Sequence, residues 1–227
     1  KDELERYRQL RVVGGGGDET PYFISYTLDD ADSFEVNAAL GALMVLAIGS
    51  GHLGAQDRVR HGRLFSPQDL GLLEGPDRDL WQMPGPIMDA LGVAEGSVVA
   101  DLGAGGGWFT IRLARRVGPN GRVYAEDIQR LMLEATRRRI AREGLRNVLP
   151  VLGTESDPKL PAGKIDAVLV LDTYHEINDP VPLLRNIAKS LKPQGRVGVV
   201  DFRKDGLGPG PPLDERLDPD LIVRDAE

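Results

Sequence analysis

The chain has 227 residues, of which 41% are hydrophobic and 28% charged, a composition that supports one substantial buried core. Its net charge of −7 gives no overall basic field for DNA or RNA, which argues against nucleic acid as a partner. The chain contains no cysteine, which excludes disulfides, thiolate metal sites and nucleophilic catalysis by a thiolate.

Residues 1–60 form a polar N-terminal extension with a weak strand predicted at 22–28 and an apolar run at 38–48. The run is shorter than the roughly 20 residues of a membrane-spanning helix, so we expect no stable membrane span. Small residues after the run are typical of a cleavable export signal, whereas the acidic residues before it favour a buried helix. We therefore expect a cytoplasmic protein, or an exported or membrane-associated one if the run is a signal.

Residues 61–96 are predicted to form a helical and irregular lead-in to the main domain. The part up to Pro86 is rich in Arg, Asp, Gly and Pro and is expected to be irregular, and a short helix follows at 87–91. Trp81 is its main apolar anchor, and we expect it either in a lid over a ligand or in the core.

From residue 97 onward, apolar runs of strand length alternate with amphipathic helical stretches, which is typical of an α/β domain with a doubly wound, mostly parallel sheet. Strands are predicted at 98–100, 123–125, 148–152, 165–171 and 197–200, and helices at 108–117, 129–143 and 181–191. Pro150 lacks a backbone N–H and favours an edge position for the third strand. A further helix is predicted to start at Asp218-Pro219.

The most informative motif joins the first of these strands to the first helix. It reads Asp101-Leu-Gly103-Ala-Gly105-Gly-Gly107, and glycines at alternate positions let the backbone approach a ligand where a Cβ would collide. A dinucleotide-binding turn would place a third small residue at position 108, which is Trp. The spacing instead resembles motif I of class I S-adenosylmethionine-dependent methyltransferases.

The resemblance extends to about residue 202 and implies a Rossmann-like fold of the class I methyltransferase type. It also implies that the glycine turn holds the methionyl part of S-adenosylmethionine through contacts from Asp101, Gly103, Ala104, Gly105 and Gly107. After the third strand, Thr154 and Glu155 stand where the family usually holds the adenine amino group.

An acidic pair, Glu126-Asp127, ends the second strand. Nucleotide-binding α/β folds place an acid there to accept the ribose hydroxyls, and the resemblance favours Asp127, with Ile128 beside it, over Glu126. The structural alternative for Asp127 is a solvated carboxylate or a helix N-cap.

The fourth strand ends in a polar motif that contains Asp172, Tyr174 and His175. The ligand crevice of an open α/β sheet lies outside the carboxyl ends of the strands where the strand order reverses, so these residues are expected to face the cofactor. His175 is a candidate general base because its ordinary pKa suits neutral pH, and Tyr174 is a second catalytic candidate. His175 could equally line the pocket, and it lacks a second histidine at metal-ligand spacing, so no metal site is expected.

The implied activity is methyl transfer from S-adenosylmethionine to an unidentified small-molecule acceptor. A non-catalytic S-adenosylmethionine-binding module is the alternative, and an NAD-dependent oxidoreductase or an aminopropyl transferase is more remote. The sequence does not indicate an oligomeric state.

The methyltransferase domain is assigned to residues 97–227. A complete class I methyltransferase adds two strands as an antiparallel hairpin at the sheet edge, and no residues remain for them after the helix near Pro219. We therefore expect a domain truncated at its C-terminus, with a hydrophobic sheet edge left exposed.

Overall fold

The computed structural model describes residues 22–27, 63–202, 204 and 210–226, and for 22–27 only the backbone. Six strands form one sheet in the order β1-β6-β5-β2-β3-β4. The strands are β1 Tyr22–Thr27, β2 Val98–Leu102, β3 Arg122–Asp127, β4 Val148–Leu152, β5 Ile165–Leu171 and β6 Leu191–Asp201. The helices are η2 Pro67–Leu73, α2 Arg78–Gln82, α3 Pro84–Ala90, α4 Trp108–Val117, α5 Arg130–Arg142, η3 Tyr174–Glu176, α6 Pro180–Ser190 and α7 Pro219–Ala226.

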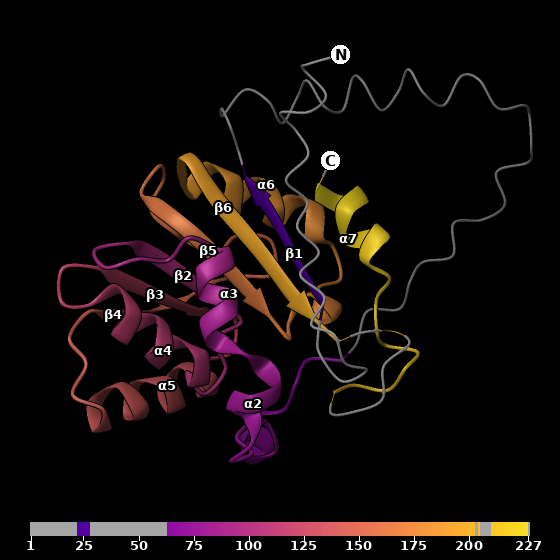
Figure 1. Cartoon of the computed structure of the whole chain (residues 1–227). Helices are drawn as coiled ribbons and strands as arrows, with labels where there is room; N and C mark the ends of the chain where they lie inside the picture. Colours follow the sequence, from indigo (N-terminus) through magenta and orange to yellow (C-terminus); the bar gives the residue numbers. More distant parts are fainter. Residues whose placement is uncertain (1–21, 28–62, 203, 205–209, 227) are drawn as a thin grey trace, which may run out of the picture.

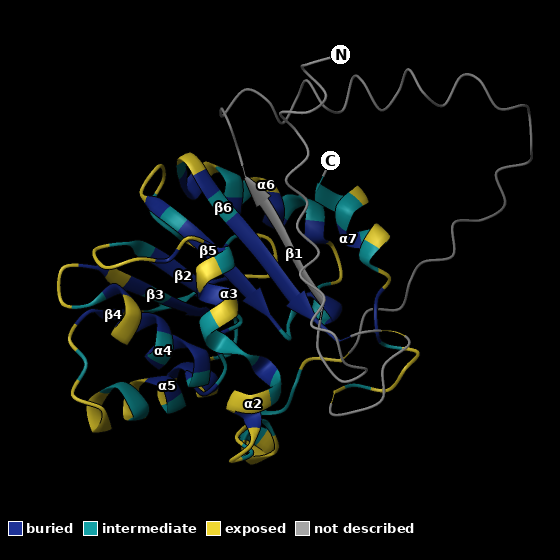
Figure 2. Ribbon diagram, viewed as in Figure 1, coloured by how far each residue is buried: buried dark blue, intermediate teal, exposed yellow. Residues whose placement is uncertain are grey.

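Strands β2 to β6 run parallel, and helices cover both faces of the sheet (Figure 1). Successive strand residues point to opposite faces, so each central strand contributes to two cores. Val99 of β2 packs with Leu113 of α4 on one face, and Ala100 joins Ile187 of α6 and Ile222 of α7 on the other. Figure 2 shows these central strands as almost continuously buried. The predicted Rossmann-like fold is confirmed.

The strand order places a ligand crevice between β2 and β5. Strand β2 pairs with β3 on one side and with β5 on the other, so the chain reverses its winding direction at β2. The carboxyl ends of β2, β3 and β5 therefore border one opening at the edge of the sheet. The edge position predicted from Pro150 is confirmed, because β4 is the last strand and Pro150 lies opposite Ala125 of β3.

The strand predicted near residue 22 forms and covers the outer edge of β6. Strand β1 pairs antiparallel with β6 along six residues, from Tyr22 opposite Asp201 to Thr27 opposite Arg196. The expectation of an exposed edge at this last parallel strand is therefore wrong, because backbone groups from a segment far away in the sequence satisfy its hydrogen bonds. Figure 1 shows the indigo β1 lying along the orange β6.

The lead-in is more ordered than its composition indicates. Helices η2 and α2 occupy part of the stretch up to Pro86 that was expected to be irregular, and Ser66 caps η2 by accepting a hydrogen bond from the Gln68 amide. The apolar run at 38–48 lies outside the described residues. Within the described part of the chain, every helix is too short or too polar to cross a bilayer.

One buried side chain, that of Asn147, caps the C-terminal end of α4. Asn147 Nδ2 donates to the carbonyl oxygens of Ala114 and Gly118, at 2.8 Å each, where a helix terminus lacks partners of its own. We expect Asn147→Ala to lower the free energy of unfolding by about 1–3 kcal/mol, because two acceptors lose their donor. Asn186→Ala, which removes an exposed hydrogen bond to Ser156, should cost less than about 0.5 kcal/mol in the same urea titration. Equal losses in the two variants would contradict this role of Asn147.

Candidate active site

The glycine turn leaves β2 and enters α4 with its backbone in the left-handed region. Gly103, Gly105 and Gly107 have φ values of 71°, 54° and 78°, which residues with a Cβ rarely adopt. A Cβ on Gly103 would lie 2.4 Å from the side chain of Thr173, whereas a Cβ on Gly105 would meet no atom closer than Leu70 Cδ2 at 3.9 Å. The turn therefore packs against the end of β5 at its first glycine and is open at its second.

Asp127 fixes the conformation of this turn. Its Oδ2 accepts the Gly105 amide at 2.9 Å and its Oδ1 accepts the Gln129 amide at 2.8 Å, where α5 begins. Thr136 of α5 donates to the Gly105 carbonyl at 2.6 Å. Burial raises the pKa of Asp127, and these backbone donors oppose the shift. The carboxylate thus joins the end of β3, the glycine turn and the start of α5.

A pocket with roughly 840 Å³ of empty space, open solvent at its mouth included, lies over the carboxyl ends of β2, β3 and β5. Seven of the predicted site residues line it: Gly103, Gly105, Asp127, Ile128, Thr154, Glu155 and Asp172. The other five predicted residues, Asp101, Ala104, Gly107, Tyr174 and His175, do not line it. An apolar wall of the pocket comes from the lead-in, from the loop before α6 and from α6 itself, with Leu64, Phe65, Leu73, Ile177 and Leu183.

Two buried acids lie near the turn. Asp101 accepts a hydrogen bond from the Thr110 hydroxyl at 2.5 Å, and burial raises its pKa to about 6. Glu126 lines the pocket, and burial together with the neighbouring charge of Asp127 raises its pKa to about 8. A Cβ on Gly153 would overlap the Glu126 carboxyl, so this glycine leaves space for the acid. Glu126 is therefore mainly protonated at neutral pH.

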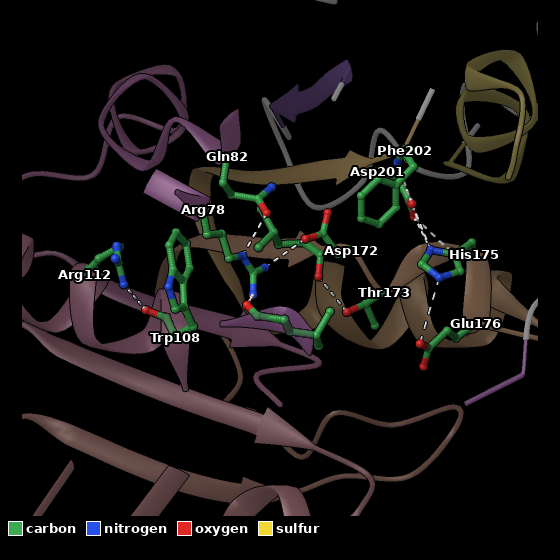
Figure 3. A network of polar contacts seen from close by, with 12 residues as sticks. Arg78, Gln82, Trp108, Arg112, Asp172, Thr173, His175, Glu176, Asp201 and Phe202 are labelled. Carbon is green, nitrogen blue, oxygen red and sulfur yellow. Dashed lines mark hydrogen bonds and ion pairs between the residues drawn. The ribbon is translucent and has the colours of Figure 1, made fainter. Parts of the chain in front are cut away.

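A buried arginine that the sequence analysis missed connects the lead-in to the end of β5 (Figure 3). Arg78 forms an ion pair with Asp172 at 2.9 Å and donates to Gln82 Oε1 and the Leu73 carbonyl. Its guanidinium lies 4.3 Å from the ring centre of Trp108. No local pattern distinguishes this arginine from the exposed charges around it, because its partners lie far along the chain.

Trp81, the predicted anchor of the lead-in, packs outside the pocket. Its ring lies 6.5 Å from that of Phe202, and the Arg78 guanidinium is 5.7 Å from its centre. Trp81 is not among the pocket-lining residues. Trp81 is half-buried and belongs to neither hydrophobic core, so the choice between a lid and a core role stays open.

Two polar atoms beside Arg78 lack partners. Among the residues that the structure describes, Gln82 Nε2 and Asp172 Oδ1 are buried without hydrogen-bonding geometry to any group. Asp172 also has a φ of 50°, which is unfavourable for a residue with a Cβ and is common at functional sites. Burial raises the pKa of Asp172 to about 6 despite the charge of Arg78. Asp172 Oδ1, at the end of β5, is therefore a buried acceptor beside the pocket that Asp172 lines, whereas Gln82 of α2 is fully buried next to Asp172 and is not among the pocket-lining residues.

His175 and Tyr174 lie in η3, directly after this point. His175 Nδ1 is 2.8 Å from Asp201 Oδ1, at the end of β6, and Tyr174 donates its hydroxyl to Asp225 of α7 at 3.0 Å. Glu176, which the sequence analysis did not select, lines the pocket and lies in the same motif. Within the described residues, no group of three or more histidines and acids is arranged to hold a metal ion.

Comparison with known proteins identifies this arrangement. Residues 99–195 match the methyltransferase domain family. Ubiquinone/menaquinone biosynthesis C-methyltransferase UbiE from Pasteurella multocida is 37% identical over 130 residues, covering 54% of this chain and 46% of that protein. Nocamycin O-methyltransferase from Saccharothrix syringae is 33% identical over 126 residues, covering 56% and 42%. The chain thus spans somewhat less than half the length of these two relatives.

Solved structures agree with the sequence matches. The crystal structure of a SAM-dependent methyltransferase from Aquifex aeolicus superposes with a TM-score of 0.68 at 30% identity, covering 72% of this chain and 88% of that chain. The chain is a member of the class I S-adenosylmethionine-dependent methyltransferase family.

Proposed function

We propose that the pocket binds S-adenosylmethionine along the carboxyl ends of β3, β2 and β5 and that the chain methylates a small hydroxylated ring compound. The observation that carries this proposal is the glycine turn, which has the fixed carboxylate of Asp127 on one side and the buried acceptor Asp172 Oδ1, without a hydrogen-bond donor, on the other. The bound cofactor supplies an electrophilic methyl group on a positively charged sulfur.

The adenosyl end of the cofactor fits the β3 side of the pocket. Asp127 accepts the ribose hydroxyls, since each of its oxygens has lone pairs left after binding a backbone amide. Thr154, Glu155 and Ile128 form the wall beyond it, where the adenine would lie. The open second glycine of the turn, Gly105, lets the cofactor approach the backbone closely.

The amino acid end of the cofactor fits the β5 side. An ammonium group is a donor that satisfies Asp172 Oδ1, which lines the pocket. A carboxylate beside it is an acceptor for Gln82 Nε2, which is fully buried next to Asp172. The ion pair with Arg78 holds Asp172 in place for this contact.

The class of methyl acceptor is proposed from the polarity and charge of the rest of the pocket wall. Leu64, Phe65 and Leu183 make this wall apolar, while the carboxyl groups of Asp172 and Glu176 disfavour an anionic compound. A neutral phenol or hydroquinone meets both conditions. The name of one relative, a ubiquinone/menaquinone biosynthesis C-methyltransferase, supports a ring acceptor, and the name of the other, an O-methyltransferase, supports transfer to a hydroxyl oxygen.

The proposal is tested by incubating the chain with methyl-labelled S-adenosylmethionine and a panel of phenols and naphthohydroquinones. We expect label in at least one neutral ring compound and none in carboxylated or phosphorylated analogues. Tight cofactor binding without transfer to any acceptor would favour the non-catalytic binding module instead.

The proposed ribose contact predicts that substitutions of two neighbouring acids, Asp127 and Glu126, change ligand affinity by different amounts. Asp127→Asn should weaken S-adenosylhomocysteine binding by about 1–3 kcal/mol, because charge-assisted hydrogen bonds to the ribose are lost. Glu126→Gln should change affinity less than about twofold at pH 7, because the Glu126 carboxyl is already mainly protonated. Calorimetry measures both variants, and unchanged affinity in the Asp127 variant would reject its role.

The proposed contact with the amino acid end predicts that a Gln82 substitution weakens the binding of only those ligands that carry an aminocarboxylate. Gln82→Met removes the donor at similar size and should weaken S-adenosylhomocysteine binding about tenfold. The affinity for 5′-methylthioadenosine, which lacks the aminocarboxylate, should stay the same in this variant. If both ligands weakened equally, Gln82 would be structural and would not contact the ligand.

A further inference from the structure

A second cluster of titratable groups lies beside the acceptor side of the pocket. Glu176 and His175 end the motif after β5, and Asp201 ends β6, so the pairing of these parallel strands brings the three side chains together. His175 Nδ1 contacts Asp201 on one side, and His175 Nε2 faces Glu176 Oε1 at 3.9 Å on the other. Figure 3 shows the imidazole between the two carboxylates.

Asp201 determines which nitrogen of His175 carries the proton. Its carboxylate is almost fully buried and accepts the backbone amides of His175 and Phe202 as well as Nδ1. An ionised carboxylate can only accept, so Nδ1 is the donor and the lone pair of neutral His175 is on Nε2. Nε2 is directed toward Glu176 (Figure 3).

Glu176 is the member of the cluster that reaches the pocket. It lines the apolar wall, whereas His175 does not. Its Oε1 accepts the amide of Phe65 at 3.2 Å and faces His175. Within the described part of the chain, Oε2 accepts no hydrogen bond, which leaves it for a ligand.

We propose that Glu176 takes the proton from the acceptor hydroxyl and that His175, oriented by Asp201, receives this proton through Nε2. The inference rests on the proposed function and assigns the proton acceptor of that reaction. The acceptor O–H bond breaks toward Glu176 Oε2, and the acceptor oxygen forms the new bond to the methyl group. If the conjugated ring carbon forms this bond instead, its C–H proton is lost afterwards and the oxygen regains a proton, so the net release is the same. The proton on Glu176 passes to Nε2, which is 3.9 Å from Oε1, when the carboxyl group turns or a water molecule bridges the two groups. The S–CH₃ bond breaks with its electron pair left on sulfur as a neutral thioether, and one net proton is released per transfer.

The charges around the cluster suit this task. Burial raises the pKa of Glu176 to about 7, with further contributions from Asp127 and Asp201, while His175 and the Phe65 amide oppose the shift. Burial lowers the pKa of His175, but the carboxylates of Asp201, Glu176 and Asp172 more than offset this effect and raise it above its ordinary value. Both groups therefore exchange protons near neutral pH.

The first experiment needs no acceptor and follows ¹⁵N-labelled histidine by NMR in the full chain. The sequence has only three histidines, so the resonance that His175→Asn removes identifies His175. We expect the Nδ1–H form when it is neutral, and we expect Glu176→Gln to lower its titration midpoint by about one pH unit, since a facing carboxylate is lost. A proton on Nε2 in the neutral form, or an unchanged midpoint, would overturn the proposal.

The second experiment measures turnover of 1,4-naphthohydroquinone under anaerobic conditions. The kcat should rise with pH through about 7, because only ionised Glu176 accepts a proton. Glu176→Gln should lower kcat about 100-fold without changing KM, because the variant has no base. The amide oxygen of the introduced glutamine can still accept the hydrogen bond from the Phe65 amide, so the local structure should be kept. Glu176→Asp should recover part of the rate, and Glu134→Gln on the exposed face of α5 should match the wild type.

The outcomes separate this inference from the proposed function. Wild-type kcat retained in Glu176→Gln with the same pH profile would overturn the role of Glu176. If wild type methylated no acceptor at all, the proposed function would fail, and the NMR titration would still decide whether Glu176 and His175 share a proton as proposed.

Discussion

The site depends on the hydrogen bond from the Gly105 amide to Asp127 Oδ2. This contact joins the glycine turn after β2 to the end of β3, and the second oxygen of the same carboxylate holds the first turn of α5. Without Asp127, three segments that meet at the pocket would lose their common anchor. Asp127 also lines the pocket, so its structural role and its proposed contact with the ribose reinforce each other.

The pocket combines an apolar wall with several acids. Glu126, Asp127, Asp172 and Glu176 all line it, and burial raises the pKa of each. Arg78 provides one buried compensating charge, paired with Asp172. A ligand that brings a positive sulfur stabilises the ionised forms of these acids, so cation binding and deprotonation favour each other. An anionic methyl acceptor would disfavour the ionised forms of these acids.

The sequence predicts the parallel part of the sheet well because its signals are local. Apolar runs of strand length define β2 to β6, and Pro150 marks the edge strand by its missing N–H. The pairing of β1 with β6 is different, since a short strand at residue 22 carries no information about a partner at residue 201. The expectation of an exposed edge was wrong for this reason.

The site was only partly predictable for a related reason. The glycine turn and Asp127 follow from a motif with fixed spacing, and both line the pocket. Arg78 and Gln82 lie in a polar lead-in where nothing local indicates burial, and they meet Asp172 only through the fold. Glu176 stands next to His175 in the sequence, but only the fold shows which of the two faces the pocket.

The most direct test of the account is a crystal structure of the chain with S-adenosylhomocysteine. We predict that the ribose hydroxyls contact Asp127, that the backbone of Gly105 borders the ligand, and that the aminocarboxylate lies between Gln82 and Asp172. A ligand bound elsewhere, or a pocket that accepts NAD and excludes S-adenosylhomocysteine, would contradict the account.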